Sequence, residues 1–294
     1  MTRALVLSGG GPVGIAWQTG LSAGLVSKGV DLSEADFIVG TSAGSAVGAR
    51  LALGRDMLEL TEAYREPSGL LAFERPRVAD VVGRMEYIMK TMGETLASVR
   101  SPEEQRAAIA KFAVEADTPT EEEFVARFPD LVGAPFPAGY ACTAVDLFTG
   151  AFRLWDSSSD VRLDRAVASS CCIPGMSPPV TIHGSRYIDG GSRSVTNADV
   201  ATGHDTVLIV SLSSPAREAA NPADPLAART REQVERERAE LLDAGARLEV
   251  VGPDEDAAAA IGANLMDAQS APAAADAGFR QGQAMSATLA GFWS

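Results

Sequence analysis

The sequence predicts one domain, residues 1–294, of the three-layer α/β/α class with a mainly parallel central sheet. Near the N-terminus, short apolar runs alternate with helical segments, which is the order of parallel strands joined by helical crossovers. Two of these runs end in glycine-rich turns, at residues 9–14 and 40–44. A chain of 294 residues that is 46% hydrophobic is long enough to bury one large core.

The first elements alternate between strand and helix. Residues 3–8 predict a buried strand, which leads through the first glycine-rich turn into a helix over residues 15–27. Residues 36–39 predict the second strand. The small residues that follow the second turn predict a helix to about residue 53.

Residues 55–135 predict a helical insertion, because charge density rises and helical periodicity dominates there. Thr120, followed by three glutamates, is typical of a helix N-cap. We expect the insertion to act as a cap over an apolar binding site, since methionines suit apolar ligands of variable shape. The alternative is that its apolar stripe packs on the sheet as ordinary core. The stripe consists of Leu70, Leu71, Phe73, Val81, Val82, Met85, Tyr87, Ile88, Met89 and Met92.

Sheet character returns after the insertion. Residues 140–145 and 151–155 predict a hairpin, and residues 163–170 predict a short helix. The remaining predicted elements are a strand pair (180–183 and 185–188), a strand (206–211), a loop (213–225), a helix (229–244), a strand (247–251) and a helical tail (256–292).

Charge and composition restrict the partners and the compartment. The net charge of −14 disfavours nucleic acid and leaves at most transient contact with lipid surfaces. The N-terminal apolar run, residues 4–7, is too short for a signal peptide or a transmembrane segment, so we expect a cytoplasmic protein. The three cysteines, Cys142, Cys171 and Cys172, show no metal-binding spacing and predict reduced thiols. The sequence does not indicate an oligomeric state.

The second glycine-rich turn has the pattern of a nucleophile elbow. Ser42 stands between Gly40 and Gly44, directly after a predicted strand and before a predicted helix. The glycines permit the sharp turn, which displays the serine hydroxyl at the helix N-terminus. The alternative is a structural serine in a tight turn. The pattern in this context predicts that Ser42 is a catalytic nucleophile.

The first glycine-rich turn allows two functional interpretations. Gly9, Gly10, Gly11 and Gly14 fit a dinucleotide-binding fingerprint, but the second strand ends without the carboxylate that would bind ribose. The same glycines suit an oxyanion hole, because their backbone amides converge at a helix N-terminus near the elbow. We favour the oxyanion hole over the fingerprint and over a purely structural turn.

The activating base is predicted to be Asp189. It closes a strand and is followed by Gly190 and Gly191, and burial raises the pKa of a carboxylate so that it becomes a useful base. The two histidines fit less well, because His204 lies at the entrance to a strand, the edge opposite the elbow. The alternative is that Asp189 and Gly190 form a hairpin turn in which the aspartate is solvated and has no catalytic role.

Three motifs in a fixed order carry a family resemblance: residues 9–14, residues 40–44 and Asp189-Gly190-Gly191. Residues 168–175 and 178–180 also resemble the family's stretch before the aspartate. The chain resembles the patatin-like phospholipases, serine-aspartate lipid acyl hydrolases, over roughly residues 3–54 and 140–212. It departs from them at Val13, where members commonly carry Arg or Lys, and at Asp199, where a proline is frequent.

The resemblance implies roles and an activity. Ser42 would be the nucleophile, Asp189 the general base, and the Gly10 and Gly11 amides the oxyanion donors. The implied reaction is phospholipase A-like hydrolysis of carboxylic esters of lipids, through an acyl-enzyme and without a metal or organic cofactor. The alternatives are a catalytically weak lipid-binding or regulatory protein on the same fold and, less favoured, a dinucleotide-binding protein.

Overall fold

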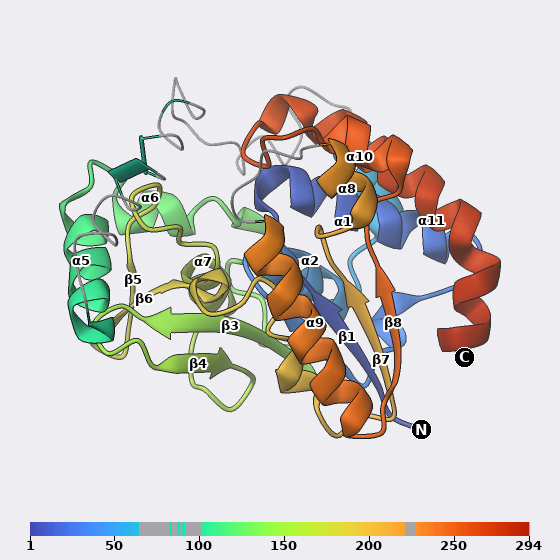
Figure 1. Ribbon diagram of the computed structural model, residues 1–294, viewed down its shortest axis with the longest axis horizontal. Coiled ribbons are helices and arrows are strands. Elements are labelled where there is room, and N and C mark those ends of the chain that lie inside the picture. The colour runs from blue at the N-terminus through green and yellow to red at the C-terminus, as the bar shows by residue number, and fades with distance from the viewer. Residues whose placement is uncertain (65–82, 84–86, 89, 92–100, 221–226, 294) are drawn as a thin grey trace.

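An eight-stranded, mostly parallel sheet forms the centre of the protein, as a computed structural model shows (Figure 1). The structure describes residues 1–64, 83, 87–88, 90–91, 101–220 and 227–293. The strand order is β5-β6-β3-β2-β1-β7-β8, and β4 pairs with β3. The strands are β1 (Arg3–Leu7), β2 (Phe37–Gly40), β3 (Tyr140–Asp146), β4 (Phe152–Trp155), β5 (Val180–Ile182), β6 (Ser185–Asp189), β7 (Thr206–Val210) and β8 (Arg247–Val251).

Helices cover both faces of the sheet. On one face, Leu5 and Leu7 of β1 pack into a core shared with α1, α2 and α11. On the other face, Ala4 and Val6 meet η5 and Leu241 of α9. Alternate side chains of one strand therefore point into two cores, and the predicted three-layer α/β/α class is confirmed.

The α-helices are α1 (Gly11–Val26), α2 (Ala43–Ala52), α3 (Met57–Ala63), α5 (Pro102–Glu115), α6 (Glu121–Val125), α7 (Leu163–Ser170), α8 (Pro215–Ala220), α9 (Ala227–Asp243), α10 (Glu255–Ile261) and α11 (Ala271–Trp293). The short 3-10 turns are η1 (Leu32–Glu34), η3 (Pro129–Leu131), η4 (Gly190–Ser192), η5 (Ala198–Ala201) and η6 (Ala268–Ser270).

The C-terminal helix α11 lies against α1 with the two backbones in close contact (Figure 1). A Cβ added at Gly24 of α1 would lie 2.2 Å from the carbonyl oxygen of Phe279, and one at Gly282 of α11 would lie 2.3 Å from that of Leu21. Only glycine allows this approach. The C-terminal helix thereby supports the helix that begins at the first glycine-rich turn.

The register of β3 brings the ends of β2 and β6 together. Along one edge of β3, Cys142 pairs with Gly40, the last residue of β2, in parallel. Two residues further on, Ala144 pairs with Asp189, the last residue of β6, in antiparallel. Because β4 takes the opposite edge of β3, β2 and β6 run toward each other along the same edge. Their C-terminal ends, and whatever follows them, therefore meet.

Three segments differ from the predicted elements. Helix α1 begins at Gly11, earlier than expected, because Pro12 suits the first turn of a helix. The expected loop at residues 213–225 contains α8, whose first turn is capped by the Ser214 hydroxyl accepting from the Arg217 amide at 3.2 Å. The helical tail is two helices, since α10 ends at Ile261 and is followed by Gly262, which has a φ of 68°.

The described residues of the insertion, from 55 to 135, form helices α3, α5, α6 and η3 and contain no strand. Thr120 caps α6 as predicted and takes part in a capping box with Glu123. Of the predicted apolar stripe, only Tyr87 and Ile88 lie within the described residues; Tyr87 is exposed and Ile88 is buried.

A buried ion pair ties the insertion to α2. Arg50 of α2 is 1% exposed and donates from Nε and Nη2 to the two carboxylate oxygens of Asp130 in η3, at 2.9 and 3.1 Å. Burial raises the pKa of Asp130, but the hydrogen bond and charge of Arg50 outweigh it and hold the pKa below its ordinary value. Among the described helices, none combines the length and the apolar character needed to cross a bilayer.

Candidate active site

Ser42 occupies a tight turn between β2 and α2. Its φ of 52° and ψ of −119° are unfavourable for a residue with a side chain, and only 8% of its surface is exposed. A Cβ at Gly44 would lie 2.1 Å from the Leu7 carbonyl oxygen, and one at Gly40 would lie 2.3 Å from that of Gly44. Both flanking glycines are therefore required by close backbone contacts, which is the geometry of a nucleophile elbow.

Hydrogen bonds hold the strained turn in place. The Ser42 amide donates to the Ser170 hydroxyl of α7 at 2.9 Å. The Ser42 carbonyl oxygen accepts from the Ser45 hydroxyl at 2.6 Å and from the Cys171 thiol at 3.2 Å. With its backbone fixed on both sides, Ser42 presents only its hydroxyl for chemistry. Backbone strain that persists under such restraint is typical of functional sites.

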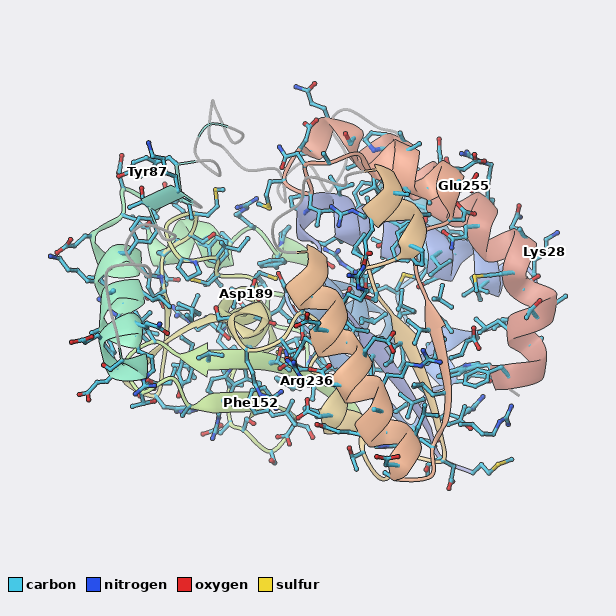
Figure 2. The ribbon with its side chains drawn as sticks, viewed as in Figure 1. Lys28, Tyr87, Phe152, Asp189, Arg236 and Glu255 are labelled. Carbon is cyan, nitrogen blue, oxygen red and sulfur yellow. The ribbon has the colours of Figure 1, made fainter. Side chains whose placement is uncertain are left out.

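Asp189 lies in the interior of the protein, in contrast to surface residues such as Lys28 and Glu255 (Figure 2). Burial raises the pKa of Asp189 from 3.8 to about 6, although hydrogen bonds from the Ser42 hydroxyl and the Gly191 amide oppose the shift. The Gly191 amide donates to Oδ1 of Asp189 at 2.7 Å. The carboxylate is thus ionised at neutral pH and more basic than an ordinary aspartate.

The glycine-rich turn packs directly against Ser42. A Cβ at Gly9 would lie 3.4 Å from the Cβ of Ser42. Two of the four predicted oxyanion donors are already engaged, however: the Gly9 amide donates to the Val195 carbonyl at 2.8 Å, and the Gly14 amide donates to the Gly10 carbonyl at 2.8 Å inside the helix. Gly9 and Gly14 are therefore removed from the predicted oxyanion hole. The Gly14 amide forms a helical hydrogen bond because α1 begins at Gly11.

The other two amides remain available. Within the described residues, the amides of Gly10 and Gly11 have no hydrogen-bond acceptor in the chain. The same holds for the amide of Ala43, in the first turn of α2, which the sequence analysis did not single out. Gly11 and Ala43 both line the cleft that contains Ser42. The N-termini of α1 and α2 therefore both face this cleft. Helix N-termini carry amides without acceptors and favour negative charge.

Asn197, a buried residue with a φ of 49°, connects the loops that carry Ser42 and Asp189. Its side-chain amide nitrogen lies 3.0 Å from the hydroxyl oxygen of Thr41, the residue before Ser42. The same nitrogen lies 2.6 Å from the Ser194 carbonyl oxygen and 3.2 Å from that of Gly190, the residue after Asp189. Asn197 was not among the site residues predicted from the sequence.

Neither histidine takes part in the site. The ring of His204 stacks on Phe37 with centroids 5.3 Å apart, at the start of β2. His183 lies in the turn between β5 and β6, and its Nε2 is 3.2 Å from the Ser159 carbonyl oxygen. Both are held away from the C-terminal ends of β2 and β6, whereas Asp189 is the last residue of β6.

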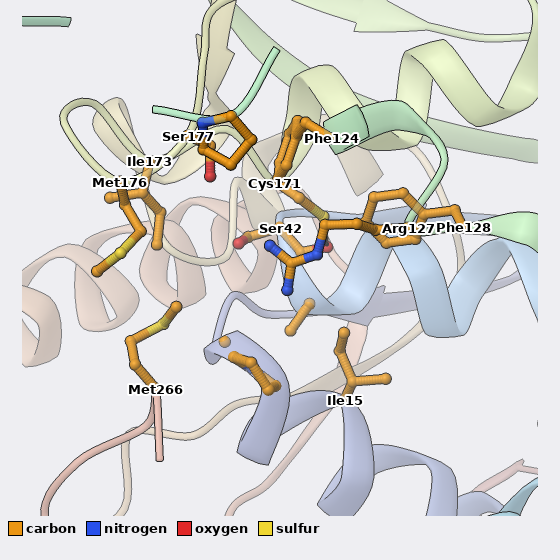
Figure 3. Close-up of a pocket in the computed structure, with 14 residues that line it drawn as sticks. Ile15, Ser42, Phe124, Arg127, Phe128, Cys171, Ile173, Met176, Ser177 and Met266 are labelled. Carbon is orange, nitrogen blue, oxygen red and sulfur yellow. Dashed lines mark hydrogen bonds between the residues drawn. The ribbon is translucent and has the colours of Figure 1, made fainter. Parts of the chain in front are cut away.

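A largely apolar cleft with about 690 Å³ of empty space, part of it open to solvent, leads to Ser42 (Figure 3). One wall comes from the insertion, with Phe124 and Phe128. Another comes from Cys171 and the turn after it, and Met266 approaches from the segment between α10 and α11. The remaining lining residues are Gly11, Pro12, Ile15, Ala43, Pro119, Arg127, Ile173, Met176 and Ser177.

Comparison with known proteins places the chain in a family. A sequence model of the patatin-like phospholipase family matches residues 5–202, which include both Ser42 and Asp189. No curated protein matches the chain in sequence. Among solved structures, the crystal structure of VipD from Legionella pneumophila is similar with a TM-score of 0.42 and 13% sequence identity, over 98% of this chain and 67% of that one. Because the family match covers about two thirds of its length, the chain belongs to the patatin-like phospholipase family.

Proposed function

We propose that the protein is a serine hydrolase that cleaves carboxylic esters of lipids through an acyl-enzyme on Ser42, with Asp189 as the general base. The observation that carries this proposal is the pairing along β3, which brings the end of β2 and the strained turn of Ser42 next to the end of β6, the buried Asp189. Membership in a family of lipid acyl hydrolases supports it.

In the first half-reaction, Oγ of Ser42 attacks the carbonyl carbon of the ester while Asp189 accepts the hydroxyl proton. The negative charge moves to the carbonyl oxygen, where the free amides of Gly10, Gly11 and Ala43 are the available donors. Collapse of the tetrahedral intermediate breaks the bond to the alcohol oxygen. Asp189 returns its proton to that oxygen, and the acyl group remains on Ser42 as an ester.

The second half-reaction repeats these steps with water. Asp189, ionised again, takes a proton from a water molecule that attacks the acyl carbon. The same amides face the new oxyanion, and the Ser42–acyl bond breaks to release the carboxylic acid. A pKa near 6 suits both roles, because Asp189 has to accept and return one proton within each half-reaction.

The walls of the cleft favour a lipid ester over a polar one. Aromatic rings from Phe124 and Phe128 and the side chains of Ile15, Ile173 and Met176 offer an acyl chain an apolar surface. The wall from residues 119–128 belongs to the insertion, which we assign as a substrate-covering part of a single domain. Thioethers at Met176 and Met266 adapt to chains of different shape.

A comparison of two variants tests the proposed base. Asp189→Asn should lower kcat for hydrolysis of a medium-chain acyl ester by about 100- to 10,000-fold, the usual contribution of a general base. A variant with both His183→Gln and His204→Gln should keep most of the activity, since neither ring reaches Ser42. Circular dichroism verifies that each variant is folded. If the double histidine variant is as inactive as Asp189→Asn, the dyad is wrong.

A further inference from the structure

Glu237 of α9 is a buried carboxylic acid that the proposed mechanism does not use. Only 2% of its surface is exposed, whereas the neighbouring Arg236 and Arg238 on the same helix are exposed. Burying a carboxylate is costly unless hydrogen-bond donors satisfy it, and an apolar side chain of the same size would avoid that cost. The presence of Glu237 at a core position of α9 therefore requires an explanation.

Two donors from one loop meet the carboxylate. Oε2 of Glu237 accepts from the Thr196 hydroxyl at 2.5 Å and from the Ala198 amide at 2.8 Å. Oε1 accepts from the side-chain amide of Gln233, one turn earlier in α9, at 2.7 Å. Thr196 and Ala198 are themselves fully buried. Glu237 thus fastens α9 to the residues on both sides of Asn197.

The fastened loop is the one that joins the turns of Ser42 and Asp189. Asn197 has a φ of 49°, which a residue with a side chain rarely adopts, so its backbone needs restraint from its neighbours. Its side-chain oxygen accepts from Nη1 of Arg193 at 2.8 Å, which fixes the orientation of the amide. The amide nitrogen then faces Thr41, before the nucleophile, and Gly190, after the base, at 3.0 and 3.2 Å.

We infer that Glu237 is a positioning residue for the proposed reaction and acts through residues 194–198. The chain of hydrogen bonds runs from Glu237 to the residues beside Asn197, and from Asn197 to the residues beside Ser42 and Asp189. The inference rests on the proposed function and deepens it, because a general base works only within hydrogen-bond reach of the proton that it accepts.

The position of Glu237 in the chain and in the fold sets it apart from the site already described. It lies beyond residues 5–202, the part that the family model matches. Helix α9 covers the face of the sheet that η5 also covers (Figure 1). The described residues that line the cleft lie outside residues 189–198. A change at Glu237 should therefore affect the catalytic step and leave binding of the acyl chain intact.

The test compares two variants of Glu237 on p-nitrophenyl octanoate, a medium-chain ester. Glu237→Leu has a similar size but no acceptor, so it should lower kcat by about 10- to 100-fold, the effect of a small misplacement of catalytic groups, with KM nearly unchanged. Glu237→Gln keeps one acceptor oxygen for Thr196 and Ala198 and should retain most of kcat. The rate at which a fluorophosphonate labels Ser42 should fall in Glu237→Leu and not in Glu237→Gln.

Thr196→Val is a milder variant that keeps the inference testable if Glu237→Leu does not fold. It replaces the hydroxyl with a methyl group of similar size and removes one of the two hydrogen bonds between Glu237 and the loop. We expect a smaller fall in kcat, again with KM nearly unchanged. Urea denaturation verifies that each variant is folded under the assay conditions.

Leu241→Ala is the matched control for a loosened helix. Leu241 lies one turn after Glu237 on α9, is fully buried and packs in the core on that face of the sheet. Its truncation leaves a cavity and lowers stability, but the hydrogen bonds of Glu237 remain, so kcat should stay close to that of the wild type.

Three results would overturn the inference: wild-type kcat in the folded Glu237→Leu and Thr196→Val variants, an equal fall in Leu241→Ala, or a rise in KM without a fall in kcat. A Glu237→Gln variant as slow as Glu237→Leu would also contradict it, since the acceptor would then not be what matters. In each of these cases the wild type is active and the proposed function stands. A wild type that neither hydrolyses the ester nor is labelled at Ser42 overturns the proposed function and this inference together.

Discussion

Replacing Asp189 with asparagine should make the protein more stable while it lowers kcat. In the folded protein the pKa of Asp189 is raised from 3.8 to about 6, because burial penalises the carboxylate. Between these two pH values the folded state holds a proton that the unfolded chain has released. Folding stability therefore falls as pH rises through this window and stays level above it. A shift of about 2 units corresponds to about 3 kcal/mol.

Asparagine has no charge to bury, so Asp189→Asn escapes this cost. We expect its free energy of unfolding to match the wild type near pH 4 and to exceed it by about 3 kcal/mol above pH 7. Urea denaturation of both proteins at these two pH values measures the difference. A variant that is no more stable than the wild type above pH 7, or a gain that is the same at both pH values, would refute the reasoning.

Asp130→Asn is the control variant, because it should lower the free energy of unfolding near neutral pH where Asp189→Asn raises it. The pKa of Asp130 is lowered in the folded protein, since the attraction of Arg50 outweighs burial. Its stabilising contribution is present above the unfolded pKa and is lost as pH falls through the folded pKa. The substitution removes the carboxylate that pairs with the buried guanidinium of Arg50, so it should cost about 3 kcal/mol near pH 7 and less in acid. Two buried carboxylates thus respond in opposite directions to the same change.

Three further predictions concern the site. The kcat/KM of the wild type should rise with pH and level off above an apparent pKa near 6, since protonated Asp189 cannot accept the Ser42 proton; a profile governed by a group near pH 8 would contradict this. Ser42→Gly should unfold with a free energy about 1 kcal/mol above that of Ser42→Ala, because only glycine accepts a φ of 52° without strain; equal urea midpoints would show that the turn is not strained. Asn197→Ala should destabilise the protein by about 2 kcal/mol and lower kcat, because it removes the buried amide that donates to the Ser194 carbonyl and to the Thr41 hydroxyl; a variant with wild-type stability would show that Asn197 does not hold the two loops together.

The parts of the fold that local signals specify were predictable from sequence. The strand before each glycine-rich turn appears where it was expected and a helix follows each turn, although α1 begins earlier than predicted, because apolar runs, glycines and small residues act over short distances. The cap at Thr120 is equally local. Ser214 followed by Pro215 is also a local signal for a helix start. The prolines and alanines around it nevertheless led to the prediction of a loop where α8 forms.

The parts that depend on distant pairing were not predictable in the same way. The sequence pointed to Ser42 and Asp189 separately, whereas their meeting requires β6 to pair antiparallel with β3 directly beyond the end of β2. The cleft likewise combines Arg127 from the insertion with Met266 from the C-terminal region. Asn197 bridges the two loops only after both have folded, so no local pattern marks it.

Covalent labelling of Ser42 tests the central claim most directly. A fluorophosphonate that carries an acyl-like chain should react with the wild type, and mass spectrometry of the digested protein should place the adduct on the peptide that contains Ser42. Labelling and ester hydrolysis should both disappear in Ser42→Ala, and the labelling rate should fall in Asp189→Asn, since the hydroxyl then lacks its base. An adduct on another serine, or labelling that survives Ser42→Ala, would contradict the account.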